Sequence, residues 1–122
     1  MSGGDVAAMP VERLVQSYRD AAARHGEALT VGNHKVANKA ADVIAAIYSE
    51  LRRRGATAQN HLIQLLDDPT PRVRGWAAAH ALEFAPDKGE AVLQELALHS
   101  GFLGVSAETT LKEWRAGRLR FP

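Results

Sequence analysis

Hydrophobic residues recur every three or four positions along most of the chain, which is the period of a helix with one buried side. The pattern is clearest between residues 35 and 54, where the apolar positions are Val36, Ala40, Val43, Ile44, Ile47 and Leu51. The apolar–polar alternation typical of a half-buried strand does not occur. The pattern therefore predicts an all-α protein.

Proline and glycine divide this pattern into about six helices, because proline suits the first turn of a helix and glycine the residue after its last turn. The expected helices end near residues 26, 54, 67, 84, 101 and 116, with Thr70 as the expected N-cap of the fourth helix and Ser106 as that of the sixth. The short connections between them favour antiparallel pairs. Residues 1–8, with Gly3 and Gly4, are expected to be flexible, and residues 9–122 to form a single helical domain.

One stretch is unusually rich in alanine. It reads LLDDPTPRVRGWAAAHALEF and covers residues 65–84. Alanine removes side-chain bulk and lets two helix axes approach closely. Val73, Ala77 and Ala81 form one line on the expected helix, with Ala78 and Leu82 beside it. The segment is therefore predicted to pack tightly against two neighbouring helices at once.

The same region, LIQLLDDPTPRVRGWAAAHALEFA, resembles a HEAT repeat in its Asp-Pro turn, its Val-Arg pair and its alanine-rich second helix. The whole chain, including its ending ETTLKEWRAGRLRFP, resembles a family of short bacterial proteins known only as a domain of unknown function and described as HEAT-like. These resemblances imply a short HEAT-like α-solenoid of three antiparallel pairs, in which Asp68 and Arg74 bind between repeats. They imply no activity.

Composition narrows the function classes. The formal net charge is +1 and there is no cysteine, which excludes disulfides, zinc ribbons and thiol nucleophiles. No signal peptide and no apolar run of roughly 18 residues are visible, so a cytoplasmic protein without membrane contact is expected. The histidines are scattered without metal-ligand spacing. The glycines of HSGFLGVS lack the pattern of a nucleotide loop. We therefore expect no metal and no cofactor, with Phe102 and Leu103 filling the core.

The leading functional hypothesis is a non-enzymatic protein–protein interaction module. Arg72, Trp76, His80 and Glu83 lie on the side of the helix opposite the alanines, and Trp and Arg are enriched at interface hot spots. Trp76 would anchor a protein or peptide partner there. The other interpretation is that the N-terminal hairpin or the tail covers Trp76. His80 and Glu83 would form either a helix-surface pair or an acid–base pair.

Two further hypotheses remain open. Nucleic acid would bind through two basic clusters, although acidic residues are nearly as numerous as basic ones. These clusters are Arg52, Arg53 and Arg54, and Lys112, Arg115, Arg118 and Arg120. A small molecule would instead bind in a pocket between helix pairs, with His80 taking part. Self-association is a further expectation, because a short stack of repeats leaves apolar end faces.

Overall fold

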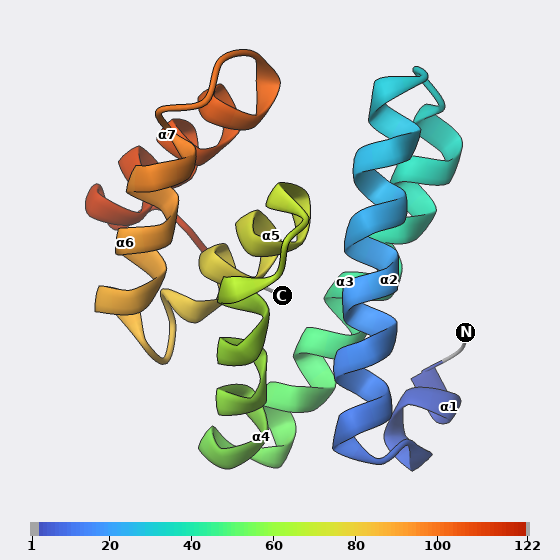
Figure 1. Ribbon diagram of the computed structural model, residues 1–122. Coiled ribbons are helices and arrows are strands. Elements are labelled where there is room, and N and C mark those ends of the chain that lie inside the picture. Colours follow the sequence, from blue (N-terminus) through green and yellow to red (C-terminus); the bar gives the residue numbers. More distant parts are fainter. Residues whose placement is uncertain (1–2, 122) are drawn as a thin grey trace. The chain divides into compact units, whose positions relative to one another are not determined.

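All regular structure in the computed structural model is helical, and no strand occurs in residues 3–121, the part of the chain that it describes (Figure 1). The all-α prediction is confirmed. Two compact units follow one another, the first ending at His61 and the second beginning at Leu62. The elements are α1 (Gly3–Ala8), α2 (Val11–Thr30), α3 (His34–Arg54), α4 (Ala56–Asn60), the 3-10 helix η1 (His61–Asp67), α5 (Pro71–Ala81), α6 (Pro86–Leu96) and α7 (Phe102–Arg115).

The first unit is built on α2 and α3, which run side by side in opposite directions (Figure 1). Large side chains fill the space between helices, and the largest of them, Tyr18 and Tyr48, are almost completely buried. Burial raises the pKa of the Tyr18 hydroxyl well above its ordinary value, and the neighbouring Tyr48 adds to this shift. The Gln59 amide donates a hydrogen bond to the Tyr48 hydroxyl at 3.1 Å, which ties α4 to α3.

Helix ends in the first unit differ from those predicted. α2 does not stop at Gly26 but continues to Thr30, because Gly26 and Ala28 are both buried and extend its packed side. The chain turns at Gly32, whose φ of 74° suits glycine. The side chain of Asn33 then caps α3 by accepting a hydrogen bond from the Val36 amide at 3.1 Å.

The start of the chain forms a helix from residue 3 onward, where the sequence predicts a flexible segment. α1 contacts α3, and Val6 is only 2% exposed, so burial of this side chain gives the short helix its place. Residues 1 and 2 lie outside the described range. The expectation of one domain over residues 9–122 stays a prediction.

The second unit packs α5 against α6 and α7. Ala77, Ala78 and Ala81 are fully buried, as the sequence predicts. Gly89 of α6 faces them so closely that a Cβ atom there would lie 2.7 Å from the Ala78 carbonyl oxygen. The alanine row therefore does bring two helix backbones close together.

The turn before α5 is held by Asp68, which is buried. Its carboxylate accepts a hydrogen bond from the Thr70 amide at 2.9 Å, and its carbonyl oxygen accepts one from Arg74 at 2.8 Å. Thr70 stands at the predicted N-cap with Pro71 after it, but its own side chain makes no capping bond. The two residues that the HEAT resemblance singles out are thus joined within one turn.

α7 begins at Phe102, earlier than the predicted start at Ser106, with Gly101 at its N-cap in a left-handed conformation (φ 79°). Gly104 accounts for the tight connection, because a Cβ atom there would collide with the carbonyl oxygen of His99. The segment after α6 therefore folds directly onto the first turn of α7. This register decides which side chains of α7 point outward.

Candidate functional site

The predicted partner-binding residues of α5 do not form one open face. Arg72 and Trp76 are half-buried, His80 is only 4% exposed, and Glu83 is exposed just beyond the end of the helix. The expectation that His80 belongs to a free surface is therefore wrong. Trp76 is neither fully exposed nor buried, so its role as a binding anchor stays a prediction.

The C-terminal tail covers His80. The Phe121 ring lies 4.9 Å from the His80 ring, at 56° between their planes, and the Trp76 ring lies 6.2 Å from His80 on the same helix. The tail is fixed by Glu113, whose carbonyl oxygen accepts hydrogen bonds from the amides of Arg118 and Leu119 at 2.9 and 3.2 Å. The sequence-based alternative had the N-terminal hairpin or the tail cover Trp76, whereas the structure places the Phe121 ring of the tail against His80.

Arg72 lies instead against α7. Its guanidinium carbon is 5.1 Å from the centroid of the Phe102 ring, the geometry of a cation–π contact. This contact joins the first turn of α5 to the first turn of α7. Among residues 3–121, no oxygen atom forms a hydrogen bond or ion pair with the Arg72 guanidinium. This half-buried arginine therefore contacts the Phe102 ring, and its guanidinium N–H groups have no acceptor among the described residues.

Large apolar side chains are exposed beside this contact. Leu98 is 87% exposed, Phe102 61% and Val105 62%, and we call these three residues the apolar patch. The expectation that Phe102 fills the core is wrong, and Leu103 is only half-buried. The reason is the register of α7. Its inward side is formed by Gly104, Ala107 and Leu111, which places Phe102 and Val105, one turn apart, on the outward side.

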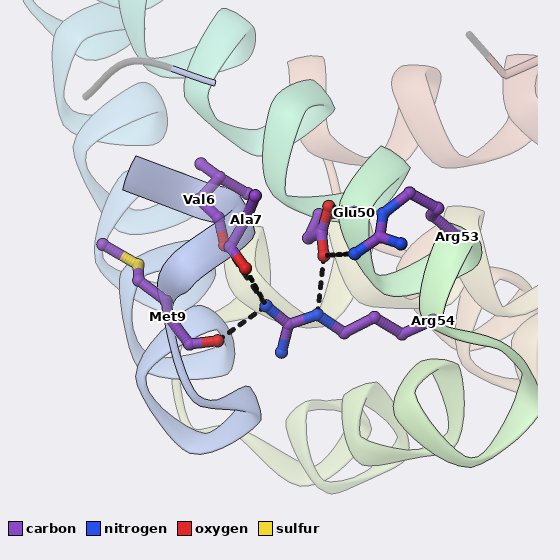
Figure 2. Close-up of polar contacts among 6 residues, drawn as sticks. All are labelled: Val6, Ala7, Met9, Glu50, Arg53 and Arg54. Carbon is purple, nitrogen blue, oxygen red and sulfur yellow. Dashed lines mark hydrogen bonds and ion pairs between the residues drawn. The ribbon is translucent and has the colours of Figure 1, made fainter. Parts of the chain in front are cut away.

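The first basic cluster holds α1 rather than presenting free cations (Figure 2). The Glu50 carboxylate accepts hydrogen bonds from Arg53 at 2.6 and 3.0 Å and from Arg54 at 2.6 Å. Arg54 also donates to the carbonyl oxygens of Val6, Ala7 and Met9 at 3.3, 3.2 and 2.6 Å. The hydrogen bonds from Arg53, followed by that from Arg54, are the largest causes that lower the pKa of Glu50 to about 2.

Arg52, the remaining member of this cluster, lies over the Tyr48 ring at 5.2 Å from its centroid. The guanidinium of Arg52 therefore also contacts a residue of the first unit. All three cations lie in the last turn of α3, where they oppose the negative pole of that helix, and Arg54 also bonds to the carbonyl end of α1.

Most cations of the second basic cluster are paired with carboxylates. Lys112 lies 3.2 Å from Glu108, Arg115 3.1 Å from Glu90, and Arg118 2.8 Å from Glu113. Arg120 donates to the Leu119 carbonyl oxygen at 2.9 Å. The two clusters belong to different units. Nucleic-acid binding stays a prediction, and the local carboxylates offset the charge on which it depends.

Residues 3–121 show neither a cluster of metal ligands nor a helix that could span a membrane. No three histidine, aspartate or glutamate side chains in that range lie close enough to hold a metal ion together. None of the helices there combines the length and the apolar character needed to cross a membrane.

Sequence reasoning missed the exposure of Phe102 and its contact with Arg72. A signal was present for the first of these. With Gly101 taken as the N-cap, Phe102, Val105 and Thr109 fall on one side, opposite Ala107 and Leu111. No sequence signal connects Arg72 to Phe102, or Arg54 to α1, because both contacts join segments far apart along the chain.

Comparisons with known proteins agree with the helical fold and add no activity. A family model described as a domain of unknown function (DUF2019) matches residues 12–114. The crystal structure of the protein RPA1889 from Rhodopseudomonas palustris CGA009 is similar, with a TM-score of 0.88 and 24% sequence identity. The similarity covers 96% of this chain and 98% of that one. No curated protein matches the chain.

Proposed function

The chain belongs to the family described as a domain of unknown function (DUF2019), and we propose that it is a non-enzymatic protein-interaction module. It binds a protein or peptide segment through the second unit. The observation that carries this proposal is the apolar patch, in which Leu98 in the connection after α6 and Phe102 and Val105 in the first turn of α7 are exposed. Apolar groups that gather on a surface mark interaction sites more often than singly scattered ones.

Arg72 supports this choice of surface. It comes from the residues that the sequence proposes for partner binding, and it lies against Phe102, the central residue of the patch. Arginine and aromatic side chains are the residue types that dominate binding energy at protein interfaces. We therefore propose Phe102, in place of Trp76, as the anchor of the binding surface. Trp76 is half-buried and lies one helical turn from Arg72.

The likeness to HEAT repeats also supports an interaction role. It rests on residues 60–85, where the Asp68–Arg74 turn leads into the alanine-packed α5. Proteins built from such repeats present helix surfaces to partner proteins, and their packing requires no catalytic group. A short HEAT-like solenoid is thus part of the proposal.

Paired captures from native cell extract test this function. Immobilised full-length chain is compared with the double variant Phe102→Ser/Val105→Ser and with Val31→Ser, a control at an exposed valine (77%) of the first unit. Captured proteins are quantified by mass spectrometry, and circular dichroism checks that all three chains are folded. We expect partners to be retained by the wild type and by Val31→Ser but lost by the double variant. Equal capture by all three chains would reject the patch as the binding surface.

A further inference from the structure

The proposed surface carries a cation whose polar groups are unused, and this indicates the chemistry of the partner. We infer that the partner is an acidic, apolar segment in which a carboxylate stands next to large aliphatic or aromatic side chains. The carboxylate binds Arg72, and the apolar side chains cover the patch of Leu98, Phe102 and Val105. This inference rests on the proposed function and names the class of partner.

Arg72 differs from every other arginine of the second unit. Each of the others has an oxygen partner among the described residues: Arg74 the carbonyl of Asp68, Arg115 the carboxylate of Glu90, Arg118 that of Glu113, and Arg120 the carbonyl of Leu119. Arg72 has the Phe102 ring alone. A guanidinium stacked on a ring keeps its N–H groups in its own plane, where a carboxylate can accept two of them side by side.

Neither of the two carboxylates that neighbour the apolar patch along the chain pairs with Arg72 in the described residues. Glu108, one turn beyond Val105, pairs with Lys112 at 3.2 Å. Glu95, one turn before Leu98, is exposed and forms no ion pair with Arg72 in the described part of the chain. An apolar surface with a fixed positive charge at its edge is complementary to a segment that is apolar and negatively charged.

A second copy of the chain is a poorer match for the same surface. In a two-fold symmetric dimer each patch would meet the other patch, and the two Arg72 side chains would be brought toward one another. Like charges that face each other across an interface oppose association. A different partner that supplies a carboxylate avoids this repulsion.

A displayed library of random 12-residue peptides, selected on the immobilised full-length chain, tests this inference. We expect enrichment of peptides that place aspartate or glutamate beside leucine, isoleucine, valine or phenylalanine. A selected peptide is then synthesised together with its amide form, in which asparagine or glutamine replaces the acidic residue. Dissociation constants for both peptides are measured on the wild type, on Arg72→Gln and on the control Arg115→Gln.

The expected result is a loss of about tenfold in affinity when either the carboxylate or Arg72 is neutralised, and little further loss when both are. Such non-additivity shows that the two groups bind each other. Arg72→Lys, which keeps the charge but not the planar fork, should lose part of the affinity. Arg115→Gln should bind like the wild type. Circular dichroism verifies that each variant is folded.

Three results would overturn the inference. Selected peptides could depend on Phe102 and Val105 but be indifferent to Arg72→Gln, in which case the proposed function stands and the acidic partner is wrong. Peptides could be absent or insensitive to Phe102→Ser/Val105→Ser, in which case both proposals fail. Light scattering could show a dimer that Phe102→Ser dissolves, which would make a second copy the occupant.

Discussion

The two units differ in the size of the side chains that their central helices bury. The first unit buries Tyr18, Tyr48, Ile44 and Ile47 between long helices and keeps mostly polar residues outside. In the second, α5 buries Ala77, Ala78 and Ala81, and Gly89 approaches Ala78 closely. Large side chains such as Leu93 and Leu96 are buried on α6, while Leu98, Phe102 and Val105 stay in solvent. Closely spaced helix backbones leave little room for bulk between them, and α5 accordingly buries only one large apolar side chain, that of Val73.

The units also differ in how they use charge. In the first, Glu50 joins Arg53 and Arg54 in a network that fixes α1. In the second, most ion pairs are exposed, and Arg72 has a ring in place of a carboxylate. We propose that charge stabilises structure in the first unit and serves recognition in the second.

The largest effect is expected from Glu50→Ala. Removal of the carboxylate leaves two arginines without their acceptor and loosens the hold of Arg54 on α1, at a cost of about 2–3 kcal/mol in the free energy of unfolding. Urea denaturation at pH 7 measures this. The control is Glu113→Ala, which breaks the more exposed pair with Arg118 and should cost much less. Equal losses would remove the proposed contrast between the units.

The pH dependence of stability should report the same network. The pKa of Glu50 is about 2 in the folded chain against 4.5 as its ordinary value. A carboxylate with a lowered folded-state pKa contributes stability that is complete above pH 4.5 and lost as the pH falls toward 2. The difference in unfolding free energy between the wild type and Glu50→Gln should therefore shrink over this range. A difference that stays constant would contradict the assignment.

Two glycines should show how tight the small-residue packing of the second unit is. Gly89→Ala should destabilise the chain by about 1–2 kcal/mol, because its Cβ would lie 2.7 Å from the Ala78 carbonyl oxygen, and this outweighs the better helix propensity of alanine. Gly75→Ala should stabilise it by up to about 1 kcal/mol. Its Cβ would meet Leu96 at 3.7 Å, an ordinary contact. Thermal and urea unfolding of both variants give the signs, and a stabilising Gly89→Ala would refute close backbone contact.

The smallest of these effects concerns the tail. Phe121→Ala should reduce stability by about 1 kcal/mol, the scale of an aromatic pair, because it removes the ring that lies against His80. In a Trp114→Phe background, the fluorescence of Trp76 should shift to longer wavelength as water reaches this side of α5. Arg120→Ala serves as control, since its guanidinium bonds to the neighbouring Leu119 carbonyl. An unchanged spectrum for Phe121→Ala would show that the tail does not shield Trp76.

Local sequence signals predicted much of the fold. The helix period, the prolines at the starts of α5 and α6 and the glycine after α3 found most elements, and the alanine row predicted a buried α5. The exceptions have specific causes. Gly26 did not end α2 because burial of Ala28 continues the helix, and Ser106 did not begin α7 because Gly101 allows an earlier start.

The candidate site was less accessible to such reasoning. Helical spacing placed Arg72, Trp76, His80 and Glu83 on one side of α5, but it carries no information on what lies against that side. The structure brings Phe121 to His80 and Phe102 to Arg72. Both rings come from parts of the chain that lie beyond α6. The prediction of an open face therefore failed at His80, and the exposed apolar side chains were found only in the structure.

The sequence alone determined that this protein is helical, where most helices lie and which helix packs through alanine, because these properties follow from the spacing of residues along a single segment. Only the tertiary structure decided which flank of α5 is covered, where Arg54 and Arg72 find their partners, and that Phe102 faces water. These outcomes depend on contacts between segments distant in sequence and on the register at which α7 begins. The periodicity of a single segment gives no information on such contacts or on that register.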